Sequence, residues 1–431
     1  GHAQMLSLRD LSLQLGDSKF TRNINRAVAA DRLQYEGLLK ANIADVRELE
    51  DIFSDDDDDH WLPVDVDLDI SISVDHLKGT YEYLSSIEFT AALNRSKLEV
   101  SALSFEFHDN PVHGHFKIDE SVAPPGIEVE LTANAIDDAT LRKLGLNYPG
   151  LDISLGKSVL SASAQGRTNP KILEQLSVKF TSETDKVSYS NGRFETEAEV
   201  SNLSLSLSPD EPLLLKAEGI HENRPVTISL SVDDPRALMS NRPISISASA
   251  TSPQASLRVE GDITSPRQAD GVTLKIESKG SQIDILHPSL WLPWKHTGPF
   301  QFNTTLEHKG NQLTLRDFRA EVDGNDLRGV IVMPTDADGL IDADLKSNSI
   351  VIGDVLEPDN DKNEATTPNT KIIPSFPLSS ALPRQWNGHF GWQIDRLQLD
   401  DSVFGNIAIK GQLNDGNLTL EQTGVTHPDD S

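Results

Sequence analysis

The chain has 431 residues and carries 67 Asp and Glu against 38 Lys and Arg, which gives a formal net charge of −29. Proteins bind a phosphate backbone mainly through Lys and Arg, so this charge argues against nucleic acid as a partner and against broad adhesion to an anionic bilayer. The absence of cysteine excludes disulfides, thiol catalysis and thiolate metal sites. No stretch of the sequence approaches the ~18 consecutive apolar residues of a membrane-spanning helix.

Apolar and polar residues alternate over most of the chain, beginning with the leucines of residues 6–15. This period of two is typical of a strand with one buried face. Residues 44–53 and 137–144 instead predict short helices, the second begun by Asp137 as its N-cap. The alternation predicts roughly twenty to twenty-five strands, among them residues 33–39, 64–74, 127–133, 159–164, 176–180, 198–207, 226–232, 244–250 and 255–259.

One unit of alternating apolar residues recurs along the chain. Residues 98–118 match residues 313–333 at an offset of 215, and residues 70–100 match residues 390–420 at an offset of 320. A strand followed by a short helix also recurs, at 39–49, 274–286 and 345–355. Because repeats decide the architecture, we expect one continuous β-groove over residues 1–431, with repeat units at about 69–146, 300–356 and 388–420 (truncated), an intervening β segment at 150–290, and acidic loops at 54–60 and 357–369.

The composition favours a mainly β fold built as an elongated, curled antiparallel sheet. Apolar residues make up 37% of the chain, below the ~45–50% that is usual for globular domains. A single sheet with one apolar face would account for this deficit, and at ~4.8 Å per strand twenty-odd strands would extend ~100 Å. Such a sheet must curl to hide its apolar face, which then lines a long hydrophobic groove. The predicted lining residues are Leu98, Val100, Leu103, Phe105, Phe107, Phe116, Ile118, Leu313, Leu315, Phe318, Val322 and Ile331.

Two local motifs could bind metal ions, but each has a simpler explanation. The run Asp55–Asp59 followed by His60 supplies oxygen ligands suited to Ca²⁺. It lacks the spaced ligands and turn glycine of a calcium loop, so we expect a solvated acidic loop. His113 and His115 have metal-compatible spacing on one strand face. No third ligand is evident nearby, so we expect two exposed histidines and no metal site.

The tryptophans could form an aromatic cluster that faces a lipid or a partner, namely Trp61, Trp291, Trp294, Trp386 and Trp392. The alternative is that they close an end or a seam of the core, and we favour it. Nucleophile elbows, phosphate-binding glycine loops and zinc-protease motifs are missing from the sequence. We therefore expect a protein that is not an enzyme and uses no cofactor.

Several of these motifs, taken together, resemble the AsmA family. One is the succession of residues 235–239, 242–246 and 255–266. In it a strand enters the Gly261-Asp262-Ile263 turn, and Pro266 follows. The next strand, at 272–276, then leads to an Asp-containing segment at 284–286. Residues 313–318 and 329–331 resemble a second pattern of the family, a strand pair ending in Leu-Xaa-Gly. The resemblance extends from about residue 6 to residue 420.

The resemblance implies a Gram-negative envelope protein related to bridge-type lipid transfer proteins. Such proteins are anchored in the inner membrane, project into the periplasm and are implicated in moving phospholipid toward the outer membrane. The third copy is incomplete and the anchor is missing, so we expect this chain to be a piece of a longer protein. Expected partners are a phospholipid or another acyl-chain lipid, the inner membrane through a segment outside this chain, and envelope or outer-membrane proteins.

Two functions remain compatible with the sequence. The first is a lipid conduit, in which the apolar face stays open and holds acyl chains. The second is a scaffold for outer-membrane biogenesis, in which the two halves of each curled sheet close on each other as a β-sandwich core. The alternation of apolar and polar residues is the same for an open conduit and for a closed sandwich. We favour the conduit.

Overall fold

The computed structural model describes residues 6–15, 18–29, 32–45, 62, 66–79, 83–143, 148–190, 195–221, 223–281, 298–335, 340–352, 387–399, 402–414 and 417–426. Over these residues 25 strands belong to one mixed sheet, accompanied by a few short helices. The predicted mainly β fold is therefore confirmed. The chain divides into two compact units, residues 1–225 and 226–431, so the expectation of one continuous groove over the whole chain stays a prediction.

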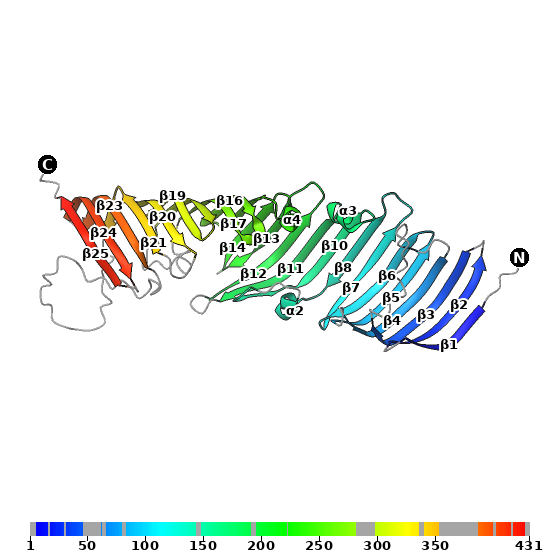
Figure 1. The fold of residues 1–431 in the computed structure, drawn as a ribbon. Helices are drawn as coiled ribbons and strands as arrows, with labels where there is room; N and C mark the ends of the chain where they lie inside the picture. Colours follow the sequence, from blue (N-terminus) through cyan, green and yellow to red (C-terminus); the bar gives the residue numbers. More distant parts are fainter. Residues whose placement is uncertain are drawn as a thin grey trace, which may run out of the picture. The chain divides into compact units, whose positions relative to one another are not determined.

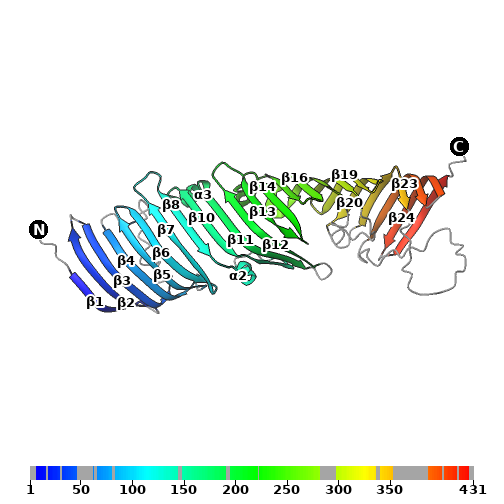
Figure 2. The same cartoon turned by 180° about the vertical axis from the view of Figure 1, so that it is seen from behind.

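In each unit successive strands lie side by side, as Figures 1 and 2 show. The helices of unit 1 are α2 (Asp138–Lys143) and α3 (Asn169–Glu174). Its strands are β1 (Leu6–Leu15), β2 (Ser18–Ala29), β3 (Arg32–Asp45), β4 (Val66–Lys78), β5 (Leu84–Asn94), β6 (Lys97–Phe107), β7 (Asn110–Asp119), β8 (Gly126–Ala133), β9 (Leu151–Ser154), β10 (Lys157–Gln165), β11 (Ser177–Ser190), β12 (Glu195–Leu207) and β13 (Leu213–His221).

Unit 2 has the short helices α4 (Ala237–Ser240) and η1 (Pro266–Gln268). Its strands are β14 (Arg224–Val232, which begins at the boundary), β15 (Ile244–Thr251), β16 (Ala255–Ser265), β17 (Asp270–Gly280), β18 (Phe300–Lys309), β19 (Gln312–Val322), β20 (Asn325–Pro334), β21 (Leu340–Ser347), β22 (Ile350–Ile352), β23 (Asn387–Leu399), β24 (Ser402–Asn414) and β25 (Asn417–Thr426).

The hydrogen-bond register repeats with the same offsets as the sequence. In unit 1 a bulge separates Val100 from Leu103, and in unit 2 the bulge lies between Leu315 and Phe318, each 215 residues further along. The extra residue of each bulge has a positive φ, 49° for both Ala102 and Asp317. One inserted residue reverses the phase of the alternation, so the apolar side chains before and after each bulge stay on the same face.

The offset of 320 also holds in the register. Val74 pairs with Ile87 in unit 1, and Ile394 pairs with Ile407 in unit 2. A second bulge follows on both β5 and β24, with φ of 51° at Ser86 and 48° at Asn406. The same pairing geometry has therefore been built twice, once in each unit.

Most neighbouring strands are antiparallel, but both repeats begin with a parallel pair. β3 runs parallel to β4, and β21 and β22 run parallel to β23. The sequence did not predict these parallel pairs. Of the helix predicted at residues 44–53, the described residues Ala44 and Asp45 belong instead to the end of strand β3, and the rest lies outside the described residues.

Among the described residues, one cluster of buried apolar side chains lies in unit 1. It consists of Phe20, Ala41, Ala44 and Val74. These residues come from β2, β3 and β4, where the parallel pair meets the antiparallel ladder. Most other apolar side chains of the described strands are only half-buried, so the hydrogen-bonded ladder contributes much of the order of each sheet.

Candidate functional site

The predicted groove residues of unit 1 lie together on one face of the sheet. Leu98 is directly opposite Ile118, and Val100 is directly opposite Phe116. Residues that face each other across paired strands point to the same side of a sheet. Beyond the Ala102 bulge, Leu103, Phe105 and Phe107 continue on this side. Val100 is buried and the other six are half-buried.

Unit 2 repeats this arrangement on β19 and β20. Leu315 pairs with Ile331, and Phe318, beyond the bulge, pairs with Gly329. The predicted residues Leu313 and Val322 follow the same phase, and all five are half-buried. The Phe318 ring meets Phe302 of β18 edge to face, with ring centroids 5.5 Å apart.

Each of these faces extends across its unit as an unbroken row of apolar residues. We call the side of the sheet that carries this row the apolar face. In unit 1 the paired residues, from β2 to β12, are Ile24, Gly37, Ile70, Ala91, Val100, Phe116, Val129, Ala162, Val178 and Leu207. In unit 2, from β14 to β25, they are Val232, Ile246, Gly261, Leu274, Leu306, Leu315, Ile331, Ala343, Phe390, Gly411 and Leu420.

Along these rows most side chains are only partly buried. In a β-sandwich two such faces interdigitate and form a buried core. Here the row residues are mostly half-buried, and Leu420 is 52% exposed. Two rows further along the same face of unit 2, Ile228 and Leu257, which both pair with Ala250, are 44% and 40% exposed. The described residues therefore leave the apolar face accessible in both units.

Polar side chains on the apolar face are mostly hydrogen-bonded within the protein. In unit 1, Ser158 and Ser182 face each other on β10 and β11, with their hydroxyl oxygens 2.8 Å apart. Asp185 Oδ1 accepts hydrogen bonds from the Ser182 hydroxyl at 2.6 Å and from the Gly156 amide at 2.8 Å. In unit 2, the Thr304 hydroxyl donates to the Arg316 carbonyl at 3.0 Å. These bonds offset the cost of placing polar groups among apolar neighbours.

The sequence analysis missed the cluster of Ser158, Ser182 and Asp185. Its members are nearly fully buried, and Asp185 Oδ2 is without a hydrogen-bond partner. The sequence does contain a signal for this cluster. The alternation of apolar residues on β11 shifts by one residue between Phe180 and Val187, as it does at Ala102. The shift corresponds to the positive φ of 64° at Thr184.

The opposite face of each sheet is polar and carries ion pairs between neighbouring strands. Lys97 pairs with Asp119 at 2.9 Å in unit 1, and Arg316 pairs with Glu307 at 2.8 Å in unit 2. His113 and His115 lie on this polar face of β7 and are exposed. Within the described part of the chain, no group of three or more His, Cys, Asp or Glu side chains is arranged to hold a metal ion.

Other predicted features fall largely outside the described residues. These are residues 55–60 and four of the five tryptophans. The fifth, Trp392, is half-buried on the apolar face of unit 2, and its Nε1 donates a hydrogen bond to the Ser347 hydroxyl at 3.0 Å. None of the helices in the described ranges is long and apolar enough to span a membrane.

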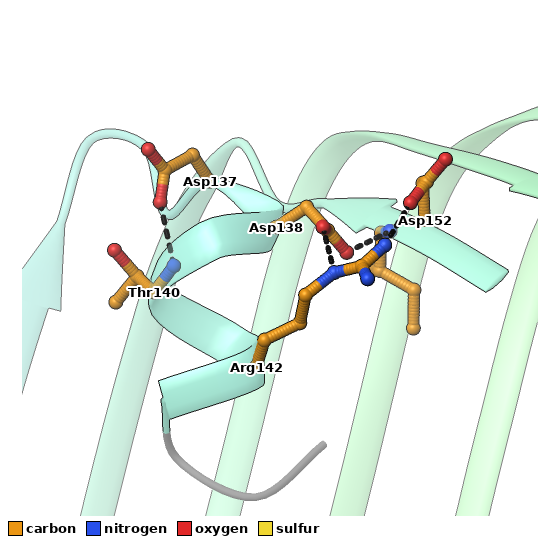
Figure 3. Close-up of polar contacts among 6 residues, drawn as sticks. Asp137, Asp138, Thr140, Arg142 and Asp152 are labelled. Atoms are coloured by element: carbon orange, nitrogen blue, oxygen red, sulfur yellow. Dashed lines mark hydrogen bonds and ion pairs between the residues drawn. The ribbon is translucent and has the colours of Figure 1, made fainter. Parts of the chain in front are cut away.

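Helix α2 closes an edge of the sheet in unit 1 (Figure 3). As predicted, Asp137 is its N-cap and accepts a hydrogen bond from the Thr140 amide at 2.9 Å. Asp138 accepts a hydrogen bond from the amide of Ile153 on β9, whose other edge pairs with β11. Arg142 forms ion pairs with both Asp138 and Asp152, and the Asp138 carboxylate raises the pKa of Arg142. The helix thus occupies an edge at which another strand could otherwise pair.

The pH dependence of stability should reflect the ionisation of the Asp119 carboxylate. Hydrogen bonds from Ser121, followed by the one from Lys97, lower the pKa of Asp119 to about 2. The folded state favours the charged form, so this stabilisation is present above the unfolded pKa of ~3.9 and is lost as the pH falls toward 2. We expect Asp119→Asn to lower the urea midpoint at pH 7 and to approach the wild-type midpoint as the pH falls below ~3. A difference between the two proteins that did not change from pH 7 to pH 2.5 would contradict this assignment.

Comparisons of the chain with family models, curated proteins and solved structures found no match.

Proposed function

We propose that the apolar faces of the two units bind the acyl chains of lipids. In this proposal the chain is a periplasmic segment of an AsmA-like protein that conducts phospholipids between the inner and outer membranes. Its role is that of a carrier and not of an enzyme. The observation that carries the proposal is the unbroken row of apolar residues across ten strands of unit 1 and eleven strands of unit 2.

An apolar surface of this kind suits an acyl chain better than a headgroup. Each buried methylene contributes ~0.8 kcal/mol, so a continuous apolar row can hold a flexible chain without any directional contact. The polar side chains on the face turn toward protein partners, as Thr304 does toward the Arg316 carbonyl. Ion-paired side chains such as Lys97 and Asp119 lie on the opposite face.

Exposure of the apolar face favours the carrier over the scaffold. A scaffold with a closed sandwich core would bury residues such as Phe105 and Phe318 fully, whereas both are half-buried. An apolar surface that stays accessible on a protein marks a binding site. In the carrier function, the acyl chain of the lipid is the ligand of this surface.

Mass spectrometry of lipids that co-purify with the protein tests the proposal. We expect phospholipid in near-stoichiometric amount after extraction from the purified chain, and its identity will name the cargo. Protein stripped of lipid should reload from vesicles of phosphatidylethanolamine and phosphatidylglycerol. A chain that carries no lipid and takes up none from vesicles would contradict the carrier function and favour the scaffold.

A further inference from the structure

A cationic and aromatic cluster lies at the end of the apolar face of unit 1, in the turn that joins β6 to β7. Phe107 is the last β6 residue on the apolar face, and the turn consists of His108 and Asp109. The Tyr83 ring lies against Phe107 with centroids 5.4 Å apart, and the His108 ring lies against Phe107 at 4.9 Å. An imidazole and a phenol thus adjoin an apolar surface.

Helix α2 brings a lysine to the same place. Lys143 Nζ lies 3.0 Å from His108 Nδ1 and is exposed. The helix is held over the turn by Asn110, whose side-chain amide donates to the Thr140 hydroxyl at 2.9 Å and to the His108 carbonyl at 3.1 Å. The ammonium and the imidazole are therefore positioned together, next to the edge of the apolar face.

Nearby carboxylates are partly engaged elsewhere. Asp137 accepts the Thr140 amide as the N-cap of α2, and Glu106 accepts hydrogen bonds from Ser85 and Ser86. The pKa of Asp137 is lowered mainly by its hydrogen bonds from Thr140, with a further contribution from Lys143 and His108. Asp109 is exposed to solvent.

The second repeat shows that this turn does not require histidine. At the offset of 215, His108 corresponds to Asp323, and Asp109 corresponds to Gly324. Both turns have two residues with positive φ, 48° and 69° in unit 1 and 49° and 78° in unit 2. Asp-Gly is the preferred sequence for such a turn, so the geometry of the turn does not by itself require a histidine at position 108.

We propose that His108 and Lys143, beside Tyr83 and Phe107, bind the phosphate group of an anionic amphiphile whose apolar part lies on the apolar face. The ammonium and the imidazole N–H donate charge-assisted hydrogen bonds to phosphate oxygens, while Phe107 contacts the first methylenes. The proposal rests on the lipid-binding function and adds a site at which a phosphate-bearing lipid is distinguished from a neutral one. In a chain with a net charge of −29, the Lys143 ammonium supplies a positive charge at this end of the apolar face.

A matched pair of ligands tests this site. Lysophosphatidic acid and monoacylglycerol with the same acyl chain differ only in the phosphate group, and inorganic phosphate supplies the anion alone. By calorimetric titration below the critical micelle concentration, we expect lysophosphatidic acid to bind about fivefold more tightly than the monoacylglycerol. The double variant His108→Asp, Lys143→Gln should lose this preference and keep its affinity for the monoacylglycerol. Inorganic phosphate alone should bind weakly or not at all.

The control variant is His115→Asp, Lys117→Gln. It makes the same residue changes and the same charge change on the polar face of β7, where both side chains lie away from the turn, and it should keep the preference. If the double variant and the control variant preferred lysophosphatidic acid over the monoacylglycerol to the same degree, the proposed site would be overturned. Tight binding of inorganic phosphate without binding of the monoacylglycerol would also overturn it. If neither amphiphile bound the wild-type protein, the lipid-binding function itself would fail.

Discussion

Replacing both Phe105 and Phe318 with aspartate is expected to reduce the phospholipid bound per protein molecule by at least about tenfold. Each phenylalanine is half-buried on the apolar face of its unit, where Phe105 pairs with Val112 and Phe318 pairs with Gly329. A carboxylate at either position must keep its water, because burying an unpaired charge costs several kcal/mol. Acyl chains would lose both the phenyl contacts and the dry surface on either side. Lipid content is measured by mass spectrometry after extraction, on protein with an unchanged circular dichroism spectrum.

The control for this variant places the same two carboxylates on the polar face. Ser101→Asp and Arg319→Asp lie on the same strands, β6 and β19, at exposed positions of the opposite phase. We expect this control to keep wild-type lipid content. Equal lipid in all three proteins would mean that the apolar face is not where lipid binds.

Replacing Gly114 or Gly329 with alanine is expected to lower the free energy of unfolding by about 1–3 kcal/mol each. A Cβ at Gly114 would lie 2.0 Å from the Glu130 carbonyl oxygen, and one at Gly329 would lie 2.0 Å from the Asp344 carbonyl oxygen. Neither oxygen can move without breaking the ladder to the next strand. The two glycines face the bulged residues Leu103 and Phe318 at equivalent places in the repeat, so the two losses should be similar.

Gly126→Ala and Gly391→Ala are the matched controls, since a Cβ at either position meets no atom within 4 Å. Urea unfolding followed by circular dichroism measures all four variants. We expect the controls to unfold within about 0.5 kcal/mol of the wild type, the usual range for a substitution away from special contacts. Alanine variants of Gly114 and Gly329 that were as stable as the controls would contradict the observed close approach of the strands.

Local features of the fold could be predicted from the sequence. Alternation located the strands because a side-chain period of two follows from strand geometry. Asp137 was recognised as an N-cap because capping depends only on nearby residues. The repeat offsets of 215 and 320 anticipated that the same register would occur twice, and the bulge at Ala102 indeed recurs at Asp317.

Pairing direction could not be predicted in the same way. A strand alternates identically in parallel and antiparallel ladders, so nothing in residues 33–45 or 66–78 indicates that β3 and β4 run parallel. Ala44 and Asp45 were assigned to a helix because the apolar spacing after them is helical, yet both residues complete β3. Their pairing with the neighbouring strand overrides the local preference.

The candidate site was predicted in part. Its twelve lining residues were expected on one side of each sheet, and the register puts them there because a bulge corrects the phase between Val100 and Leu103 and between Leu315 and Phe318. Their half-exposure could not be predicted, because an open face and a sandwich core have the same pattern. The contact between His108 and Lys143, on which the proposed phosphate site rests, could not be predicted either, since the two residues are 35 positions apart in the sequence and meet only through α2.

Photo-crosslinking at neighbouring residues tests the central claim most directly. Benzoylphenylalanine would replace Phe116 or Phe318 on the apolar face, and Lys117 or Arg319, one residue along on the polar face, in protein loaded from phosphatidylethanolamine and phosphatidylglycerol vesicles. The account predicts lipid adducts at Phe116 and Phe318 and little or none at Lys117 and Arg319. Equal labelling of the two faces, or no adduct at either phenylalanine position, would contradict the proposal that the apolar face binds lipid.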